Sequence, residues 1–323
     1  MSAFTAKAEL IEDGGAAATD DQFFRSRPFL DAEGVTHTLR IESDEGVLAC
    51  PLIVRQIEGG DQCDAISPYG YPGFHSPVPF GGMATKRNRR AIDPEAIDFS
   101  ATGLVSAFVR HALGPSPFTG ASERNVVQIA DPALPPKSRP SDRRQVRRNL
   151  EAGYVLDLVP GGETTPGQRA GFLAVYEQTM RRAGAAPHYF FAAAYFDRIL
   201  EAGRTWLALG TAPGGALAAA SIAAVSDGYL HYYLSGSADS HLREAPMKNV
   251  VTRLAEHSAE LGLPLNLGGG ISPGDALEEF KRGFANRQQA WLTSELVCDP
   301  AAYAGLSQGR EAGGFFPAYR AKS

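Results

Sequence analysis

The chain has 323 residues, of which 44% are hydrophobic and 21% are charged, and its formal net charge at pH 7 is −5. This composition is ordinary for a globular protein and excludes the fibrous and the wholly disordered classes. The negative charge argues against a protein coated with nucleic-acid-binding surface, although it leaves room for a local basic patch.

The cysteine pattern and the N-terminus bear on the compartment. The three cysteines, Cys50, Cys63 and Cys298, form no CxxC pair and have no metal-ligand spacing, which is typical of thiols in a reducing compartment. The first residues lack the basic and apolar regions of a signal peptide, and no apolar run of about 18 residues is present. We therefore expect a cytoplasmic protein that does not insert into a membrane and that binds no metal or cofactor.

The first half of the chain predicts two strands, a loop, a helix and a third strand. Strands are expected over 36–42 and 47–58, joined by a turn at 43–46. Asp93 and Pro94 resemble an N-cap and a first-turn proline and predict a helix through about Leu113, followed by a strand over 126–129.

The loop at 64–83 is unusual because it is rich in proline, glycine and aromatic residues, whereas loops are normally polar. Either it is an Ω-loop packed on its own rings, or it forms a wall of a substrate cleft in which Tyr69 and Tyr71 offer hydroxyl groups. The charged cluster at 86–90 that comes next is expected to be a solvated loop.

A segment with four prolines in ten residues, 131–140, is the best candidate for a linker between two domains. The helix expected after it presents two adjacent basic rows, because Arg143 and Arg147 are four residues apart, as are Arg144 and Arg148. Like charges at this spacing repel each other, and a phosphate-bearing partner would relieve that repulsion. The alternative is an ordinary solvated helix face.

The second half predicts helices over 165–182 and 189–202, three antiparallel strands over 206–210, 216–225 and 229–234, and a helix from Pro246 to Gly262. A short strand over 263–267 then runs into three glycines, and Asp275 is expected to cap a short helix that carries Lys281. This order matches the core of the GNAT acyltransferase fold.

Several motifs resemble the Fem-type (FemABX) branch of the GNAT superfamily, which is related to the BioF2-like acetyltransferase domain. They are RRQVRRNLEAG, YEQTMRRAG, YFFAAAYFDRIL, SPYGYPG and, most specifically, LNLGGG followed by DALEEFKRGF. The resemblance implies an α/β fold of two GNAT-like domains, each with a mixed, mostly antiparallel sheet flanked by helices. We expect a degenerate N-terminal domain at 1–135, a catalytic domain at 141–300, and a tail at 301–323 that packs back on the first domain.

The resemblance also implies an activity, the transfer of an aminoacyl group from aminoacyl-tRNA to an amine acceptor. Lys281 would be the catalytic residue, and Phe280, Gly269 and Gly270 would bind substrate together with Tyr69 and Tyr71. The four arginines at 143, 144, 147 and 148 would bind the tRNA. The residues alone favour a Lys281 that merely complements the end of a helix stopped by Gly283, and the glycines could simply form a tight turn.

Two other functions stay open. One is acyl-CoA-dependent N-acyl transfer, which the sequence disfavours because no glycine lies between Ser237 and Asn249 and because Glu244 precedes the helix whose N-terminus would bind pyrophosphate. The other is a catalytically inactive binding module. The alanine- and arginine-rich composition suits a high-GC bacterium, where the acceptor could be a muropeptide or a peptide of antibiotic biosynthesis. The oligomeric state is left open.

Overall fold

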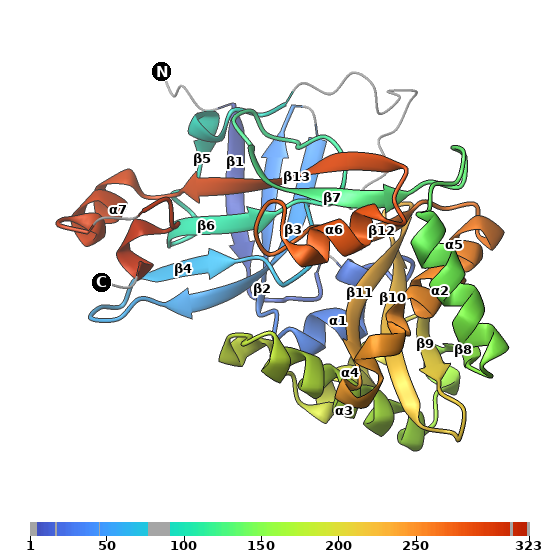
Figure 1. Ribbon diagram of the computed structural model, residues 1–323. Helices are drawn as coiled ribbons and strands as arrows, with labels where there is room; N and C mark the ends of the chain where they lie inside the picture. Colours follow the sequence, from blue (N-terminus) through green and yellow to red (C-terminus); the bar gives the residue numbers. More distant parts are fainter. Residues whose placement is uncertain (1–4, 17, 45, 77–90, 311–312, 322–323) are drawn as a thin grey trace. The chain divides into compact units, whose positions relative to one another are not determined.

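The computed structural model describes residues 5–16, 18–44, 46–76, 91–310 and 313–321 (Figure 1). The chain divides into two compact units. Unit 1 consists of Met1–Thr19, Glu33–Arg124 and Trp291–Ser323, and unit 2 consists of Asp20–Ala32 and Asn125–Ala290. Each unit is therefore assembled from segments that are distant in the sequence.

Unit 1 is built on a sheet with the strand order β5-β1-β2-β3-β4-β6-β13. Neighbouring strands are antiparallel except for two parallel pairs, β1–β5 and β4–β6. The strands are β1 (Ala6–Ile11), β2 (His37–Ser43), β3 (Gly46–Gln56), β4 (Cys63–Ile66), β5 (Ile97–Asp98), β6 (Leu104–Arg110) and β13 (Arg287–Val297), the last of which begins in unit 2.

The C-terminal segment of unit 1 packs on its sheet through a small aromatic cluster. Tyr319, in the short 3-10 helix η6 (Ala318–Arg320), is buried with Ile57 and Val105, and its hydroxyl lies 2.8 Å from Ser106 Oγ. Helix α7 (Pro300–Ser307) contributes Tyr303 to the same cluster.

Unit 2 has the strand order β7-β12-β11-β10-β9-β8, with one parallel pair, β11–β12. Its strands are β7 (Ser122–Ala130, which begins in unit 1), β8 (Val155–Pro160), β9 (Thr205–Thr211), β10 (Leu217–Ser226), β11 (Tyr229–Ser237) and β12 (Leu265–Gly268). Its helices are α1 (Arg27–Ala32), α2 (Pro140–Glu151), α3 (Pro166–Arg182), α4 (Ala193–Leu200), α5 (Met247–Glu260) and α6 (Ala276–Arg282). Short 3-10 helices lie at Phe23–Arg25 (η1), Gly161–Glu163 (η3), Pro187–Tyr189 (η4) and Asp239–Glu244 (η5).

Helices bury both faces of the unit 2 sheet. The apolar stripe of α5, with Val250, Val251 and Leu254, packs against alternate residues of β10 such as Ala219 and Ala223. The intervening residues of β10 are buried as well, and α3 covers β10 and β11. The small side chains of β10 suit such close packing because they let helices approach the strand from both sides.

The expected fold class is confirmed, because the chain is α/β, with mixed, mostly antiparallel strands flanked by helices. The helix expected from Asp93 to about Leu113 is wrong. Only a 3-10 turn (η2, Pro94–Ala96) forms there, and the strand β6 begins after Gly103, whose φ is +67°. The apolar run of β6 is buried almost continuously, and such a run is compatible with either a buried strand or a buried helix.

Candidate active site

The two central strands of unit 2 separate after a short parallel contact. β11 and β12 pair only at Leu230–Leu265 and His231–Asn266. Beyond this point β11 carries a bulge, because Ile222 of β10 pairs with Leu234 whereas Ala223 pairs with Tyr232. A bulge bends a strand and increases its twist. The bulge in β11 therefore turns this strand away from β12 just after their pairing ends.

β12 ends in the glycine turn, residues 268–270. Gly268 has a φ of +75°, which favours glycine. A Cβ on Gly269 would lie 2.5 Å from Asn125 Nδ2, and this nitrogen donates a hydrogen bond of 2.9 Å to Gly270 O. The glycines therefore allow a close approach of the Asn125 side chain, which no sequence motif indicated.

Asp275 fixes the connection from the glycine turn to helix α6. Its carboxylate accepts hydrogen bonds from the backbone N–H groups of Glu278 (2.7 Å), Ile271 (2.7 Å) and Ser272 (3.0 Å). These bonds, that of Glu278 first, lower the pKa of the Asp275 carboxyl. The expected N-cap of this helix is confirmed.

Lys281 points from α6 to the glycine turn. Only 8% of the residue is exposed, and its Nζ donates a hydrogen bond of 2.7 Å to Gly269 O. Burial lowers its pKa to about 8, and the nearby charge of Asp275 opposes this shift. An ammonium group has three N–H donors, so the bond to Gly269 leaves others for a ligand. This geometry differs from a lysine that merely complements the end of its own helix.

The structure thus brings together three of the predicted site residues, Lys281, Gly269 and Gly270. The ring of Phe280 instead packs against the core under α5 and lies 5.5 Å from the ring of Phe284. Its contact with substrate stays a prediction.

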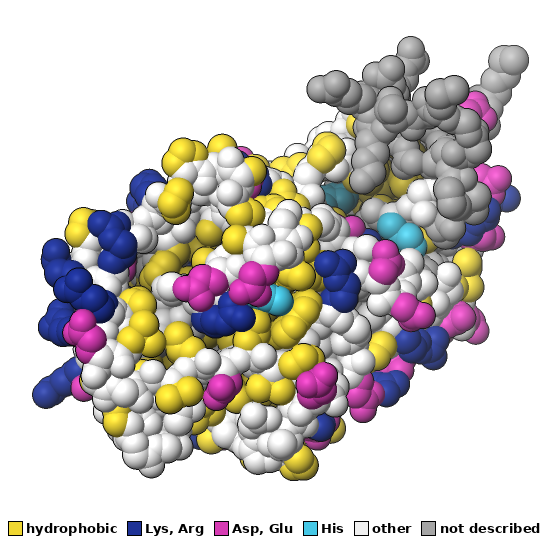
Figure 2. Space-filling model, turned by 90° about the vertical axis from the view of Figure 1, so that its right-hand side faces the viewer, with side chains coloured by type: hydrophobic (Ala, Val, Ile, Leu, Met, Phe, Trp, Pro, Cys, Tyr) yellow, Lys and Arg dark blue, Asp and Glu magenta, His cyan; other side chains and the backbone are white. Residues whose placement is uncertain are grey.

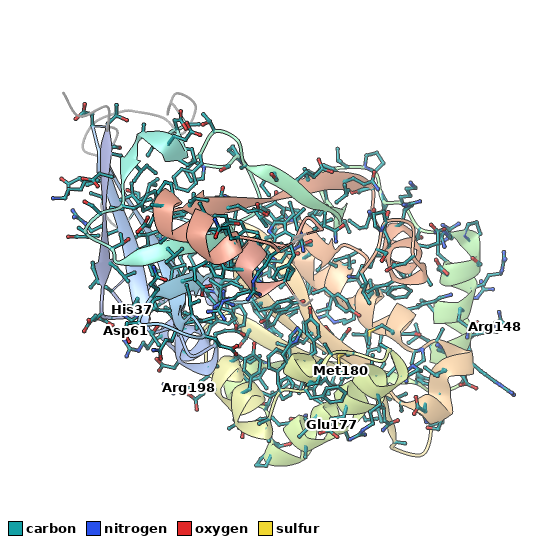
Figure 3. All side chains as sticks on the ribbon, turned by 90° about the vertical axis from the view of Figure 1, so that its left-hand side faces the viewer. His37, Asp61, Arg148, Glu177, Met180 and Arg198 are labelled. Carbon is teal, nitrogen blue, oxygen red and sulfur yellow. The ribbon has the colours of Figure 1, made fainter. Side chains whose placement is uncertain are left out.

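The four predicted tRNA-binding arginines are exposed on α2. Arg143 donates to the Ser138 carbonyl, and Arg147 lies 3.5 Å from the carboxylate of Glu151. Lys and Arg side chains gather at the left of Figure 2, the side on which α2 lies after the turn from Figure 1. Figure 3 shows Arg148 projecting away from this helix.

Tyr69 and Tyr71 belong to unit 1. Tyr69 is 38% exposed and its backbone N–H donates to Glu33, whereas the ring of Tyr71 stands edge-on to Trp291 at 5.3 Å. The candidate site around Lys281 is confined to unit 2, so a role for these tyrosines stays a prediction. The basic cluster at 86–90 lies outside the described residues.

The start of α5 is sealed by side chains from α2. The amides of Gln145 and Asn149 donate to the carbonyl of Glu244 at 3.1 and 2.8 Å. Two N–H groups of the first turn, those of Lys248 and Asn249, bond to the carbonyls of Ala245 and Pro246. A helix N-terminus binds pyrophosphate through free N–H groups, and these two donors are already paired.

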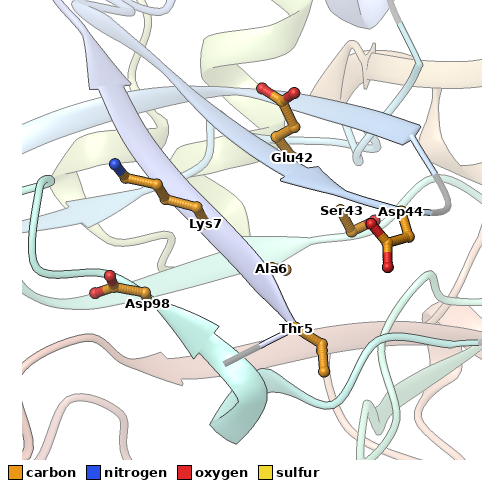
Figure 4. A pocket seen from close by; sticks show the side chains of 7 residues that line it. All are labelled: Thr5, Ala6, Lys7, Glu42, Ser43, Asp44 and Asp98. Atoms are coloured by element: carbon orange, nitrogen blue, oxygen red, sulfur yellow. The ribbon is translucent and has the colours of Figure 1, made fainter. Parts of the chain in front are cut away.

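Three further features of the described residues bear on the choice of site. A hollow of about 380 Å³ on unit 1 is open and polar and contains none of the predicted site residues; it is lined by Thr5, Ala6, Lys7, Glu42, Ser43, Asp44 and Asp98 (Figure 4). Within the described ranges, no three His, Cys, Asp or Glu side chains are grouped so that they could hold a metal ion. No helix in the same ranges is both long and apolar enough to cross a bilayer.

Comparison with known proteins bears on the fold and on the family of the domain. Residues 136–282 match the family model described as an acetyltransferase (GNAT) domain. The crystal structure of FemX superposes with a TM-score of 0.61 at 10% identity and covers 90% of this chain and 96% of FemX. The C-terminal domain of a putative lysylphosphatidylglycerol synthetase from Agrobacterium fabrum gives a TM-score of 0.52 at 12% identity, with 90% and 92% covered.

A third structure, L-PGS from Bacillus licheniformis, has a TM-score of 0.49 at 11% identity, with 84% and 90% covered. No curated protein matches the chain by sequence. At such identities the structural likeness concerns the fold. Residues 136–282 thus match a GNAT acetyltransferase domain, the chain has a FemX-like fold, and the resemblance seen in the sequence is confirmed.

Proposed function

We propose that this GNAT-type acyltransferase forms an amide bond by transferring an aminoacyl group from aminoacyl-tRNA to an amine acceptor. The observation that carries the proposal is Lys281, a buried lysine held against the glycine turn beside the separated central strands. The A. fabrum relative, which is named for a product that contains a lysyl group, supports an aminoacyl group as the moiety transferred.

The reaction needs no covalent intermediate with the enzyme. The neutral nitrogen of the acceptor attacks the carbonyl carbon of the tRNA ester, and a tetrahedral oxyanion forms. When the intermediate collapses, the carbon–oxygen bond to the terminal ribose breaks. The ribose oxygen leaves with a proton and the nitrogen loses one, so the products are an amide and a free tRNA hydroxyl.

We assign the stabilisation of the oxyanion to Lys281. With a pKa of about 8, Lys281 is protonated in most molecules at pH 7. Its remaining N–H donors can then bind a developing negative charge. Because the residue is enclosed, this interaction is stronger than the same contact in water. Gly269 O orients the ammonium group, since it takes one donor at 2.7 Å.

The exposed arginines of α2 are the proposed contacts for the tRNA phosphates. They lie on the helix whose Gln145 and Asn149 bond to the Glu244 carbonyl just before α5, so the helix that packs beside the usual pyrophosphate position presents a basic outer face. This arrangement favours tRNA over acyl-CoA as the donor. We place the reaction in the bacterial cytoplasm, with an amine of a muropeptide or of an antibiotic precursor as the acceptor.

A donor competition assay tests the proposal. The enzyme is given a peptide amine with a mixture of charged tRNAs, with and without ribonuclease, and in parallel with a panel of acyl-CoAs. We expect transfer from charged tRNA that ribonuclease abolishes. Transfer from acyl-CoA that survives ribonuclease would overturn the choice of donor and establish the CoA-dependent alternative.

A further inference from the structure

We propose that Asn266, together with the buried His231, is a positioning residue that sets the glycine turn and thereby the place of Lys281. This inference rests on the proposed role of Lys281. The two residues form the last pair of the parallel contact between β11 and β12. Asn266 lies within the LNLGGG motif, but neither side chain is among the site residues that the motifs indicated.

The carboxamide of Asn266 bridges an imidazole and the glycine turn. Asn266 is 1% exposed, and its Oδ1 accepts a hydrogen bond of 2.9 Å from the backbone N–H of Gly268. Its Nδ2 lies 3.0 Å from His231 Nδ1. Because the Gly268 N–H fixes which end of the amide is oxygen, Nδ2 must donate to the ring of His231.

The other ring nitrogen of His231 agrees with this arrangement. Nε2 lies 3.1 Å from the carbonyl of Ser226, which only accepts, so the proton sits on Nε2 and Nδ1 is free to accept. His231 is 2% exposed, and burial lowers its pKa to about 4, so the ring is neutral at physiological pH. All the bonds of the bridge are thus satisfied by one tautomer and one amide orientation.

The bridge is anchored at its far end by the N-terminal segment of unit 2. Ser226 Oγ donates to Asp227 at 2.9 Å, and Asp227 in turn is held by Arg25 through two hydrogen bonds of 2.6 and 3.1 Å. Arg25 is only 4% exposed, so this ion pair is shielded from solvent on the arginine side. Asp227 and its partner Arg25 are the charged groups at this end of the ring, and Phe24 packs edge-on to it at 4.9 Å.

The turn that Lys281 contacts is therefore held on two sides. Asn266 accepts a hydrogen bond from the N–H of Gly268, and Asn125 donates one to the carbonyl of Gly270. The carbonyl of Gly269, between them, accepts the hydrogen bond from Lys281. Loss of the Asn266 amide removes one restraint on Gly268, which has no side chain and keeps its pairing with Gln128 of β7. The carbonyl of Gly269 then moves, and Lys281 loses both its acceptor and its enclosure.

The first test follows the ionisation of Lys281 and needs neither donor nor acceptor. Lysine is labelled with ¹³C next to Nζ, and the Lys281 signal is assigned by its loss in Lys281→Met. We expect a midpoint near pH 8 in the wild type, as the burial predicts, and a rise of about one unit or more in Asn266→Ala, because the ammonium becomes more exposed.

Asn249→Ala is the matched control. Asn249 is also fully buried in unit 2 and hydrogen-bonded, to Asn149 at 2.7 Å and to the carbonyl of Val146 at 3.1 Å, and these partners lie on α2 rather than in the glycine turn. Asn249→Ala should lower the stability of the fold about as much as Asn266→Ala does, and it should leave the titration midpoint of Lys281 unchanged. Equal shifts in both variants would mean general loosening and would overturn the positioning role, as would an unchanged midpoint in Asn266→Ala.

Asn266→Asp supplies a rescue. The carboxylate still accepts from Gly268, and it regains a bond to His231 only when the ring is protonated. A carboxylate raises the imidazolium pKa, so the bond exists at low pH and is lost as the pH rises through that pKa. The turnover of Asn266→Asp relative to the wild type should fall with rising pH, with KM nearly unchanged. A ratio that does not depend on pH would contradict the bridge.

If the donor proves to be acyl-CoA, the turnover of Asn266→Asp relative to the wild type is measured with acyl-CoA instead. The Lys281 titration is unchanged, because it uses no donor. Failure of the donor assignment is therefore distinguishable from failure of the bridge.

Discussion

Each unit contains a parallel strand pair between antiparallel neighbours, β4–β6 in unit 1 and β11–β12 in unit 2, but the two pairs end differently. In unit 1 the ladder continues past Ile66–Phe108, because Ser67 N–H donates to Phe108 O and Ser67 Oγ accepts from Arg110 N–H, both at 2.9 Å. In unit 2 the pairing stops at His231–Asn266.

The segments after the two pairs differ as well. In unit 2 β12 leads into the glycine turn and α6, which carries Lys281. In unit 1 β6 leads into His111, which is buried against Phe74 and Phe118 and lies 2.7 Å from Ser294 Oγ. The sheet order alone therefore does not create a site. Among the residues described, unit 2 alone combines an opened pair with a short capped helix, and it is there that we propose the site.

The largest effect should come from Lys281→Met. If Lys281 stabilises the oxyanion, turnover should fall by about 10²–10³-fold, as for the loss of an oxyanion donor. Lys7→Met, which changes a lysine in the surface hollow of unit 1, should leave turnover unchanged. Steady-state kinetics measures the turnover of both variants, and thermal unfolding checks that they fold. Wild-type turnover in Lys281→Met would contradict an active site around Lys281.

Gly269→Ala should have the next largest effect. The new Cβ would lie 2.5 Å from Asn125 Nδ2 and would displace the amide that holds Gly270. Turnover, measured in the same steady-state assay, should drop by about 10- to 100-fold, because a small misplacement of catalytic groups is costly.

Its counterpart in unit 1 is Gly14→Ala, whose Cβ would lie 2.8 Å from the carbonyl carbon of Val35. This change should lower the melting temperature and spare the turnover of the folded fraction. If both variants reduced turnover equally, the distinction between the units would fail.

Replacing Arg143 and Arg147 together with glutamine sharpens the comparison on the donor side. The apparent KM for charged tRNA should rise by about 10-fold, and the log–log dependence on salt should flatten by about 0.7 for each phosphate that is no longer neutralised. Arg181 and Arg182 on α3, which are ion-paired with carboxylates, provide the control pair. A salt slope equal in both double variants would contradict tRNA binding on α2.

The smallest effect concerns acid stability, in which the units should behave alike. Burial lowers the pKa of both His111 and His231 from 6.5 to about 4. The unfolded chain therefore binds these protons more readily, so the stability from each ring is full above pH 6.5 and is lost as the pH falls through about 4. Replacing either histidine with glutamine removes this loss, so the pH at the midpoint of acid unfolding should fall by about half a unit. An unchanged midpoint in both variants would show that other groups control acid unfolding.

The second half of the chain was predictable because its signals are local. Pro246 and Gly262 bracket α5, Asp275 caps α6, and the glycine turn comes directly after an apolar strand, as expected. The exposure of the α2 arginines also agrees with their spacing. Patterns of this kind are set within one or two turns of backbone, where sequence and structure are closely linked.

The features that could not be predicted depend on contacts between distant residues. Nothing in the sequence around Asn125 or Asn266 shows that their amides hold the glycine turn, since each bond spans two separate elements or a register set by the sheet. The helix expected after Asp93 failed for a related reason. Distant residues bury β6, since Val105 packs with Ile57 and Tyr319 whereas Leu104, Ala107 and Val109 belong to the main core of unit 1, and its apolar run alone fits either structure.

The exchange of segments between the units has a consequence for how the chain folds during synthesis. Unit 2 includes Asp20–Ala32 and is complete once Ala290 has been made, whereas unit 1 still lacks Trp291–Ser323 at that moment. Phe23, Phe24 and Phe29, which end up fully enclosed, must wait for the β10–β11 hairpin to emerge before they are covered. The edge of β6 waits longer still, because its partner β13 is the last of the described strands, and an unpaired edge is prone to aggregate. Residues 291–323 therefore complete the unit whose first segment, Met1–Thr19, was made before any part of unit 2.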